Sequence, residues 1–446
     1  MTALKCLELC RDSKLFSCVR QFSSFPSNVY ISASNGVRCD ILWRKYAQQT
    51  VSSSQFLSPS DAVLLFHSFA KIGFKDHRVI KALSLVILKN VHSLSPCGLS
   101  LVLNGLKKFD LKNRDLLEIV TNQVCLSMDK FLPQDISLVA NSIAHFHVYH
   151  LTFWNKLNLY LKNDINLGHF EASLILMAYA KLDIRDVPTM NALLKVIVPQ
   201  FESIEIKNST LILHSLAKLD IVPKGFFEMA YLHIQNLIIH EPDKFDLQSL
   251  VLTLYTAVCL VKSPKKLIVN VMELIIPRKE ILGNYKLGKL KMVADVLILM
   301  YNDLYDAFDP DLKEFLRYIQ DTPLKIVDKS SRWGEDVSKT LDFMKIDHNT
   351  NLYIQELYAD IVFKDSKVVI KCTGPYNYYA YSKRMTAFAK LNIKLLELKG
   401  YTVIVIPFFE WSELRSLEEK VERLYQLGRE AFEKINSNRI VDKLLV

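Results

Sequence analysis

The sequence predicts an α-solenoid of helix pairs followed by a small α/β domain. One motif recurs about every 37 residues through the first two thirds of the chain. The last quarter alternates short β-type runs with helical patterns. We therefore predict five regions: a presequence or disordered N-terminus at 1–48, a helical-repeat region at 49–305, a linker at 306–329, the α/β domain at 330–435 and a C-terminal tail at 436–446.

The N-terminal region is rich in serine, cysteine and basic residues and poor in acids, which is typical of an organellar presequence. Its segment Arg20-Gln21-Phe22-Ser23 resembles a mitochondrial processing junction. The sequence therefore predicts the mitochondrial matrix, with a plastid-type organelle as the alternative.

The composition narrows the class of protein. A formal net charge of +9 over 446 residues permits a polyanionic partner without requiring one. The apolar run Leu250–Val261 falls short of the roughly 18–20 residues that cross a bilayer, so we expect a buried helix there and no membrane insertion. None of the eight cysteines forms a Cys-x-x-Cys pair, which argues against a zinc knuckle. A reducing compartment and no cofactor are expected.

The repeated motif joins an apolar helix to a short polar break and a second helix. Its clearest copies are FAKIGF, LKKFDL, IAHFHV, YAKLDI and LAKLDI, which begin at Phe69, Leu106, Ile143, Tyr179 and Leu216. Weaker copies follow from Ala257 and over Met292–Tyr301. Within each copy apolar residues recur three and four positions apart, which indicates a helix with one buried face. Helix pairs repeated at this period stack into an α-solenoid.

A basic residue follows the second position of every clear copy, at Lys71, Lys108, His145, Lys181 and Lys218. Equivalent positions of a solenoid line up, so these residues could form a stripe that holds a phosphate backbone. Alternatively, each cation satisfies the carbonyls at a helix C-terminus. The aspartates two residues further on, Asp110, Asp183 and Asp220, could also neutralise them.

Over roughly residues 60–305 this pattern resembles the 37-residue helical-pair repeats of organellar RNA-binding proteins. These are the heptatricopeptide repeats of algae and apicomplexans and the helical region of the Fas-activated serine/threonine kinase family. The resemblance implies an RNA-binding solenoid.

The α/β domain is predicted element by element. A helix over 330–344 precedes short strands at 353–357, 360–363 and 368–372, with a hairpin turn at Asp365-Ser366. A helix over 383–398 then stops at Gly400, and the wholly apolar strand 402–406 is expected to be central. A last helix over 412–432 closes the domain.

This order resembles the RAP domain, which is named for its abundance in apicomplexan RNA-binding proteins. The matching residues are Ser331, Val337, Asp360, Ile370, Gly374-Pro375, Lys394, Leu398, Gly400-Tyr401, Val403, Ile406-Pro407 and Glu410-Trp411. The resemblance implies a fold similar to restriction-type nucleases. It also implies a place among organellar RNA-processing and ribosome-associated proteins.

The nuclease chemistry itself is not expected. Such sites hold a divalent cation with two or three acids. Asp360 sits where the first acid would fall, but Lys371 and Thr373 stand where RAP domains usually carry the others, and Glu356 is misplaced for the pattern. Because the Lys371 charge opposes a metal ion, we expect no metal and no catalytic residues, and Asp360 becomes a partner of Lys371 or a cap. A metal-dependent RNA-processing nuclease is the alternative.

The segment from Lys364 to Lys399 favours RNA binding rather than RNA cleavage. Between Lys364 and Lys399 eight basic residues face two acidic ones, and tyrosines lie among them. Bases stack on aromatic rings while cations hold phosphates, which suits single-stranded RNA. Some tyrosines could instead pack between helix and sheet, and Lys390 and Lys394 could form a solvated face. The predicted RNA contacts are Lys371, Tyr376, Tyr378, Tyr379, Lys383, Arg384, Lys394 and Trp411, with Lys71, Lys108, Lys181 and Lys218 of the repeats.

We therefore expect a non-catalytic mitochondrial protein that binds single-stranded or structured organellar RNA. Its role would be to stabilise or help process ribosomal RNA or transcripts, or to serve the assembly or structure of the mitoribosome, with mitoribosomal proteins as further partners. A protein-interaction scaffold is the other alternative, since a solenoid face can bind peptides as well as RNA.

Overall fold

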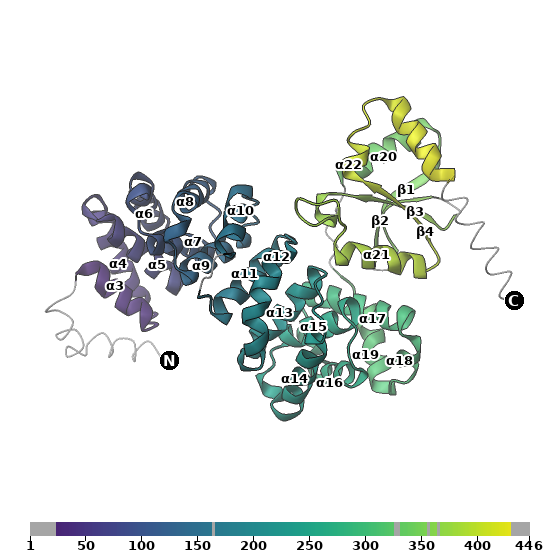
Figure 1. Cartoon of the computed structure of the whole chain (residues 1–446), viewed down its shortest axis with the longest axis horizontal. Coiled ribbons are helices and arrows are strands. Elements are labelled where there is room, and N and C mark those ends of the chain that lie inside the picture. The colour runs from purple at the N-terminus through teal and green to yellow at the C-terminus, as the bar shows by residue number, and fades with distance from the viewer. Residues whose placement is uncertain (1–23, 163–165, 325–330, 355–356, 364–365, 430–446) are drawn as a thin grey trace. The chain divides into compact units, whose positions relative to one another are not determined.

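A computed structural model describes residues 24–162, 166–324, 331–354, 357–363 and 366–429 (Figure 1). The chain divides into two compact units. Unit 1 runs to Leu182 and includes Asp186–Pro199, and unit 2 contains Asp183–Arg185 and everything from Gln200 onward. Each unit is described by itself.

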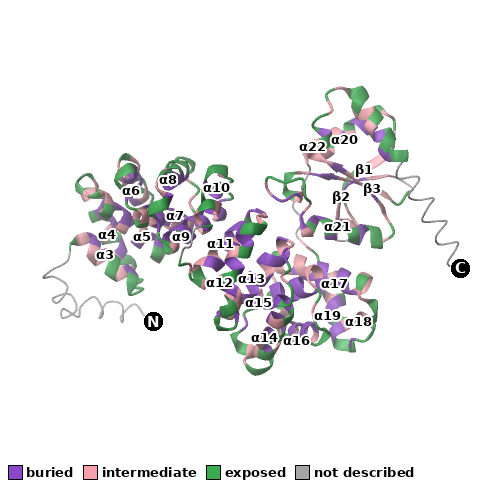
Figure 2. Cartoon of the chain, in the orientation of Figure 1, coloured by how far each residue is buried: buried purple, intermediate pink, exposed green. Residues whose placement is uncertain are grey.

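Unit 1 consists of helix pairs. The first helices of the pairs are α3 (Phe25–Ser34), α5 (Pro59–Ile72), α7 (Pro96–Phe109), α9 (Pro133–His145) and α11 (His169–Lys181). The second helices are α4 (Asp40–Ser53), α6 (His77–Lys89), α8 (Arg114–Leu126), α10 (Leu151–Tyr160) and α12 (Val187–Ile197). Each first helix packs against the next first helix, from α3 through α11. The first helices are therefore largely buried, whereas the second helices carry the exposed residues (Figure 2).

The N-terminal region does not begin as expected. Helices α3 and α4 form an additional copy of the repeat, with Ala33 and Gly36 standing 37 residues before Ala70 and Gly73. Both glycines follow their helices with a left-handed backbone, at φ of 68° and 79°, which glycine adopts without strain. The predicted presequence or disordered segment at 1–48 is therefore wrong from Phe25 onward. The segment Arg20-Gln21-Phe22-Ser23 lies outside the described residues.

The helical part of unit 2 repeats the arrangement. Its first helices, α13 (Ile206–Lys218), α15 (Leu247–Tyr255), α17 (Asn284–Met300) and α19 (Pro310–Asp321), contact one another in order. The second helices are α14 (Phe226–His240) and α16 (Lys265–Ile275), and the short α18 (Asn302–Asp306) follows α17. Among the described helices, none combines the length and the apolar character that a bilayer span requires.

Helix α19 occupies residues that were expected to be a linker. Its apolar face, made by Leu312, Phe315, Leu316 and Ile319, is buried, and the helix packs on α17. The predicted linker at 306–329 is therefore wrong over Pro310–Asp321. The acidic residues that suggested a boundary lie at the ends of this strongly amphipathic helix, where Asp309 caps its start.

The last part of unit 2 is an α/β layer structure. It contains α20 (Arg332–Phe343), β1 (His348–Ile354), β2 (Leu357–Phe363), β3 (Val368–Thr373), α21 (Ala387–Leu398), β4 (Thr402–Pro407) and α22 (Phe408–Trp411). The strand order is β1-β2-β3-β4, with β3 and β4 parallel and the other pairs antiparallel. Helices α20 and α21 lie on opposite faces of this sheet (Figure 1). A mostly helical chain with a small four-stranded sheet at its C-terminal end agrees with the predicted fold at this level.

Strand β4 is not central. Among the described strands it pairs only with β3, and it forms one edge of the four-stranded sheet. Its apolar sequence has another cause. The crossover helix α21 and the short α22 pack against β4, so an edge position remains covered. Helix α21 also begins later than predicted, since Thr386 caps it by accepting a hydrogen bond from the Ala389 N–H at 3.2 Å.

Candidate nucleic-acid interface

An ion pair joins two of the positions at which the sequence analysis looked for metal-binding acids. The Lys371 ammonium lies 3.0 Å from the Asp360 carboxylate, and their side chains are only 12% and 5% exposed. The same ammonium donates to the Tyr358 carbonyl at 2.8 Å, and the Cys372 N–H donates to Asp360 at 3.1 Å. Burial raises the pKa of Asp360 although Lys371 pulls it down. The structure thus agrees with Asp360 as a partner of Lys371, and it corrects Lys371 as an RNA contact.

Three predicted aromatic contacts are also corrected, because they are buried. The Tyr378 hydroxyl is hydrogen-bonded to that of Thr373 at 2.7 Å. The Tyr379 hydroxyl donates to the Lys218 carbonyl at 2.9 Å, and the Trp411 ring N–H donates to Asp336 at 2.7 Å. None of the three aromatic side chains is more than 5% exposed, so none offers a ring face to a base.

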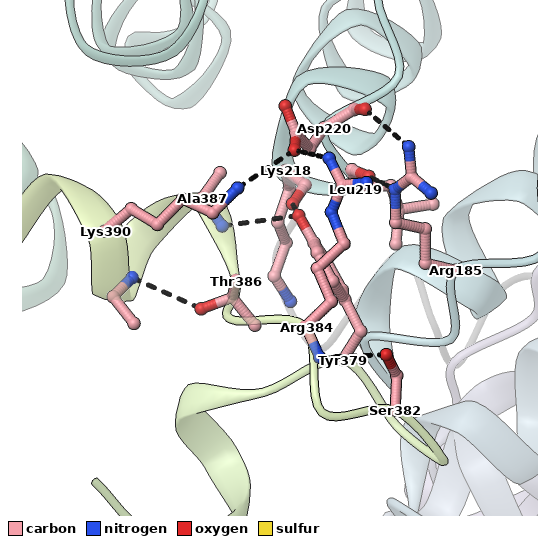
Figure 3. A network of polar contacts seen from close by, with 11 residues as sticks. Arg185, Lys218, Leu219, Asp220, Tyr379, Ser382, Arg384, Thr386, Ala387 and Lys390 are labelled. Carbon is pink, nitrogen blue, oxygen red and sulfur yellow. Dashed lines mark hydrogen bonds and ion pairs between the residues drawn. The ribbon is translucent and has the colours of Figure 1, made fainter. Parts of the chain in front are cut away.

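A network of polar contacts joins the loop before α21 to the C-terminal end of α13 (Figure 3). Tyr379 and Arg185 satisfy carbonyls that the end of a helix leaves open: Arg185 donates to the carbonyls of Leu219 and Asp220 at 2.8 and 3.1 Å. The Asp220 carboxylate pairs with Arg384 and, at 3.2 Å, with Lys390. Arg384, predicted as an RNA contact, therefore holds the α/β domain against the helices.

Two basic residues of the repeats are also paired with aspartates. His145 lies 2.9 Å from Asp110, and Lys218 lies 3.1 Å from Asp183. In both cases the cation of one copy meets the aspartate of the preceding copy, and Asp220 receives Arg384 and Lys390 in the same role. Pairing with these aspartates, which the sequence analysis left open, thus holds for His145 and Lys218.

The other repeat cations are exposed. Lys71, Lys108 and Lys181 all reach the surface of unit 1. The Lys71 ammonium is 3.4 Å from the Ser34 hydroxyl, and that of Lys181 is 3.5 Å from the His145 ring. Burial of its stem and the nearby Lys71 lower the pKa of Lys108. These three lysines remain candidates for phosphate contact.

The carboxyl ends of the parallel strands carry an aromatic surface that sequence reasoning missed. Phe408 and Phe409 follow β4 directly, and Trp333 lies on the first turn of α20. The Trp333 and Phe408 rings are stacked, with centroids 6.2 Å apart and planes at 20°. The Lys383 ammonium lies 4.8 Å from the centre of the Phe409 ring. We call Trp333, Phe408, Phe409 and Lys383 the aromatic edge.

The rings of the aromatic edge are half-buried, so each is anchored in the domain and still reaches solvent. The buried Tyr378 ring packs against Phe409, with the two ring centroids 5.2 Å apart. The sequence did contain a signal for this surface. Phe408 and Phe409 follow the predicted strand 402–406, so they are apolar residues beyond the end of an apolar strand. This surface lies where ligands bind in open α/β sheets, at the carboxyl ends of parallel strands.

Other predicted contacts on the α/β domain are accessible. Tyr376 is 86% exposed on the turn after β3, next to Gly374, whose position lies against the Trp333 ring. Lys383 is exposed as part of the aromatic edge. Lys394 is exposed on α21, 3.8 Å from Glu397 of the next turn. Among the described residues of 370–411, basic and aromatic side chains thus remain available for a ligand.

These features describe a helical-repeat protein with a small C-terminal α/β domain. Within that domain, residues 370–427 match the family model of the RAP domain. The match runs from β3 through β4 and α22 into the helical residues that follow, and RAP domains are generally RNA-binding. The comparison with curated proteins found no match.

Proposed function

We propose that the chain is an organellar RNA-binding protein of the mitochondrial matrix that acts without catalysis. Its role would be to stabilise or help process ribosomal RNA or transcripts, or to serve the assembly or structure of the mitoribosome. The RAP match at 370–427, which contains most of the aromatic edge, is the observation that carries the RNA-binding proposal. The serine-rich and basic first residues support the organelle.

The aromatic edge has the chemistry of a single-strand binding surface. Anchored rings that reach solvent can stack with unpaired bases, and stacking of this kind contributes about 1–3 kcal/mol per base. Lys383 and the exposed Arg332 add positive charge beside the rings. The N-terminus of α20 adds the positive end of its dipole, which favours a phosphate.

The absence of catalysis is proposed from the state of Asp360. Its carboxylate already accepts hydrogen bonds from the Lys371 ammonium and the Cys372 N–H. Thr373, at the last of the expected acid positions, is hydrogen-bonded to Tyr378. A metal ion would have to displace a buried ammonium to reach Asp360, and that would leave a buried charge without a partner.

Filter binding with labelled organellar RNA tests the proposal. We expect Lys383→Ala and Tyr376→Ala each to weaken binding by roughly fivefold to tenfold, because each removes one phosphate or stacking contact. Lys345→Ala is the matched control, since Lys345 is an exposed lysine beyond the opposite end of α20. Equal losses in all three variants, or no binding by the wild-type chain, would refute the aromatic edge as the RNA site.

The same preparation tests the catalytic alternative. Labelled RNA is incubated with the protein and Mg²⁺ or Mn²⁺, and we expect it to stay intact. Cleavage that co-purifies with the chain and disappears in Asp360→Asn would contradict the non-catalytic proposal.

A further inference from the structure

Four first helices of unit 1, α5, α7, α9 and α11, reach solvent along one narrow stripe over most of their length. On α5 the stripe consists of Leu64, His67 and Lys71, which lie three and four residues apart and therefore on one face. The residues between them are buried. The equivalent positions of α7, α9 and α11 are also half-buried or exposed, between residues that are buried except for Lys107. Because these helices pack side by side in order, the stripes form one surface, which we call the first-helix surface.

The first row of this surface is apolar on all four of these helices. It consists of Leu64, Leu101, Leu138 and Leu174, each half-buried. A leucine that is half-buried in four successive copies provides a repeated apolar contact of fixed spacing. A repeated exposed apolar surface often marks a binding site, and this one is suited to the flat apolar face of a ligand.

The second row is polar and lacks partners within the protein. It consists of His67, Asn104 and Asn141, with Met177 in the fourth copy. Among the described residues, the amides of Asn104 and Asn141 make no hydrogen bond, and the His67 Nδ1 atom is buried without one. A buried polar atom without a partner, such as the His67 Nδ1 atom, is rare in proteins. The half-buried amides of Asn104 and Asn141 stand at the equivalent positions, so this row can pair with a ligand that has hydrogen-bonding edges.

The state of His67 fits that role. Burial and the nearby Lys108 and Lys71 lower the pKa of His67 to about 4. The ring is therefore neutral at pH 7 and can both donate and accept a hydrogen bond, as an asparagine amide can.

The third row is basic and continuous with the second. It contains the exposed Lys71, Lys108 and Lys181, and His145 between the last two. Each lies one helical turn beyond the polar residue of its copy. The order from apolar to hydrogen-bonding to basic is complete on α5, α7 and α9, and on α11 Met177 replaces the hydrogen-bonding residue.

We propose that the first-helix surface reads the bases of single-stranded RNA, one nucleotide per repeat. The leucine contacts the base face, the His or Asn side chain pairs with the base edge, and the cation holds the phosphate. Single-stranded RNA fits better than a duplex, because the major groove of duplex RNA is too narrow for side chains and its minor groove is recognised mostly by shape. The inference rests on the proposed RNA-binding function and adds sequence specificity, with the specifying residues named.

Selection of RNA from a random single-stranded pool by the full chain, followed by sequencing, tests this inference. We expect the wild-type chain to enrich a short motif. Asn104→His and Asn141→His should each change the preferred base at one motif position, by roughly tenfold, and the two positions should be adjacent. Asn155→His is the matched control, because Asn155 is exposed on the second helix α10, and it should leave the motif unchanged.

The outcomes separate the two proposals. If the wild-type chain enriches no RNA, the proposed function fails, and this inference fails with it. If every chain binds RNA with the same motif, the proposed function stands and the base-reading surface is refuted. A further variant, Met177→Asn, should add a base preference next to the position read by Asn141, and its failure to do so would also count against the surface.

Discussion

At the scale of single residues, the Asp360–Lys371 pair is the observation on which the non-catalytic proposal rests. A lysine in place of an acid supplies the charge that Asp360 needs once the sheet buries it. The substitution was visible in the sequence, and so was its consequence, because residues opposite one another on neighbouring strands are set by simple alternation. The sequence allowed some tyrosines to be buried, but it did not show that these would be Tyr378 and Tyr379, since that depends on how the loop before α21 folds.

The pair predicts an asymmetric response to mutation. Lys371→Met leaves the Asp360 charge buried alone, so we expect the domain to lose about 3–5 kcal/mol of stability. The double variant Asp360→Leu/Lys371→Met should recover most of that loss, because it removes both charges. Thermal unfolding with hydrogen exchange in β2 and β3 measures the effect.

The double variant also tests the role of Lys371 in binding. Its affinity for RNA should equal that of the wild-type chain, because Lys371 contacts the protein rather than a ligand. A folded double variant with weakened RNA binding would restore Lys371 as an RNA contact.

At the scale of elements, the local sequence pattern predicted most helices and strands, but it did not predict which elements lie beside one another in the fold. The amphipathic α19 was missed because its acidic residues suggested a boundary, although its apolar face follows helical spacing. The copy formed by α3 and α4 was missed because Ser34 replaces the lysine of the motif. The edge position of β4 could not be predicted, because an apolar strand is equally compatible with the centre of a sheet and with an edge covered by helices.

The loop before α21 makes a contact with α13 that we expect to depend on pH. Burial alone would raise the pKa of Asp220, but hydrogen bonds from Arg384 and Lys390 hold it below its usual value. A carboxyl group with a lowered pKa stabilises the folded state above its unfolded pKa and loses that effect as the pH falls through the folded value. We therefore expect the contact between this loop and α13 to weaken in acid, below about pH 4.

Hydrogen exchange of residues 377–386, measured from about pH 6 to about pH 3, checks this expectation. Asp220→Asn should lower protection at neutral pH and remove the part of the acid response that comes from this group. Asp243→Asn changes an exposed aspartate of the same unit and should do neither. An acid response identical in all three chains would exclude Asp220 as its source.

At the scale of the whole molecule, two surfaces of different chemistry are proposed to bind one polymer. The aromatic edge offers rings with one lysine, and the first-helix surface offers a row of cations in register with the repeat. A net charge of +9 attracts RNA from any direction, so charge alone does not distinguish these surfaces from the rest of the molecule. The dependence of affinity on salt distinguishes them, because it counts the phosphates that are neutralised.

The last prediction uses that count. For single-stranded RNA, each neutralised phosphate contributes about 0.7 to the slope of log affinity against log salt. The triple variant Lys71→Ala/Lys108→Ala/Lys181→Ala should therefore lower the slope by about 2. The triple variant Lys81→Ala/Lys112→Ala/Lys195→Ala removes the same charge from exposed positions of unit 1 outside the first-helix surface, and its slope should change by less than half as much. Equal slopes in the two variants would mean that RNA senses the net charge of unit 1 rather than a row of phosphate contacts, and the first-helix surface would then lose its cationic row.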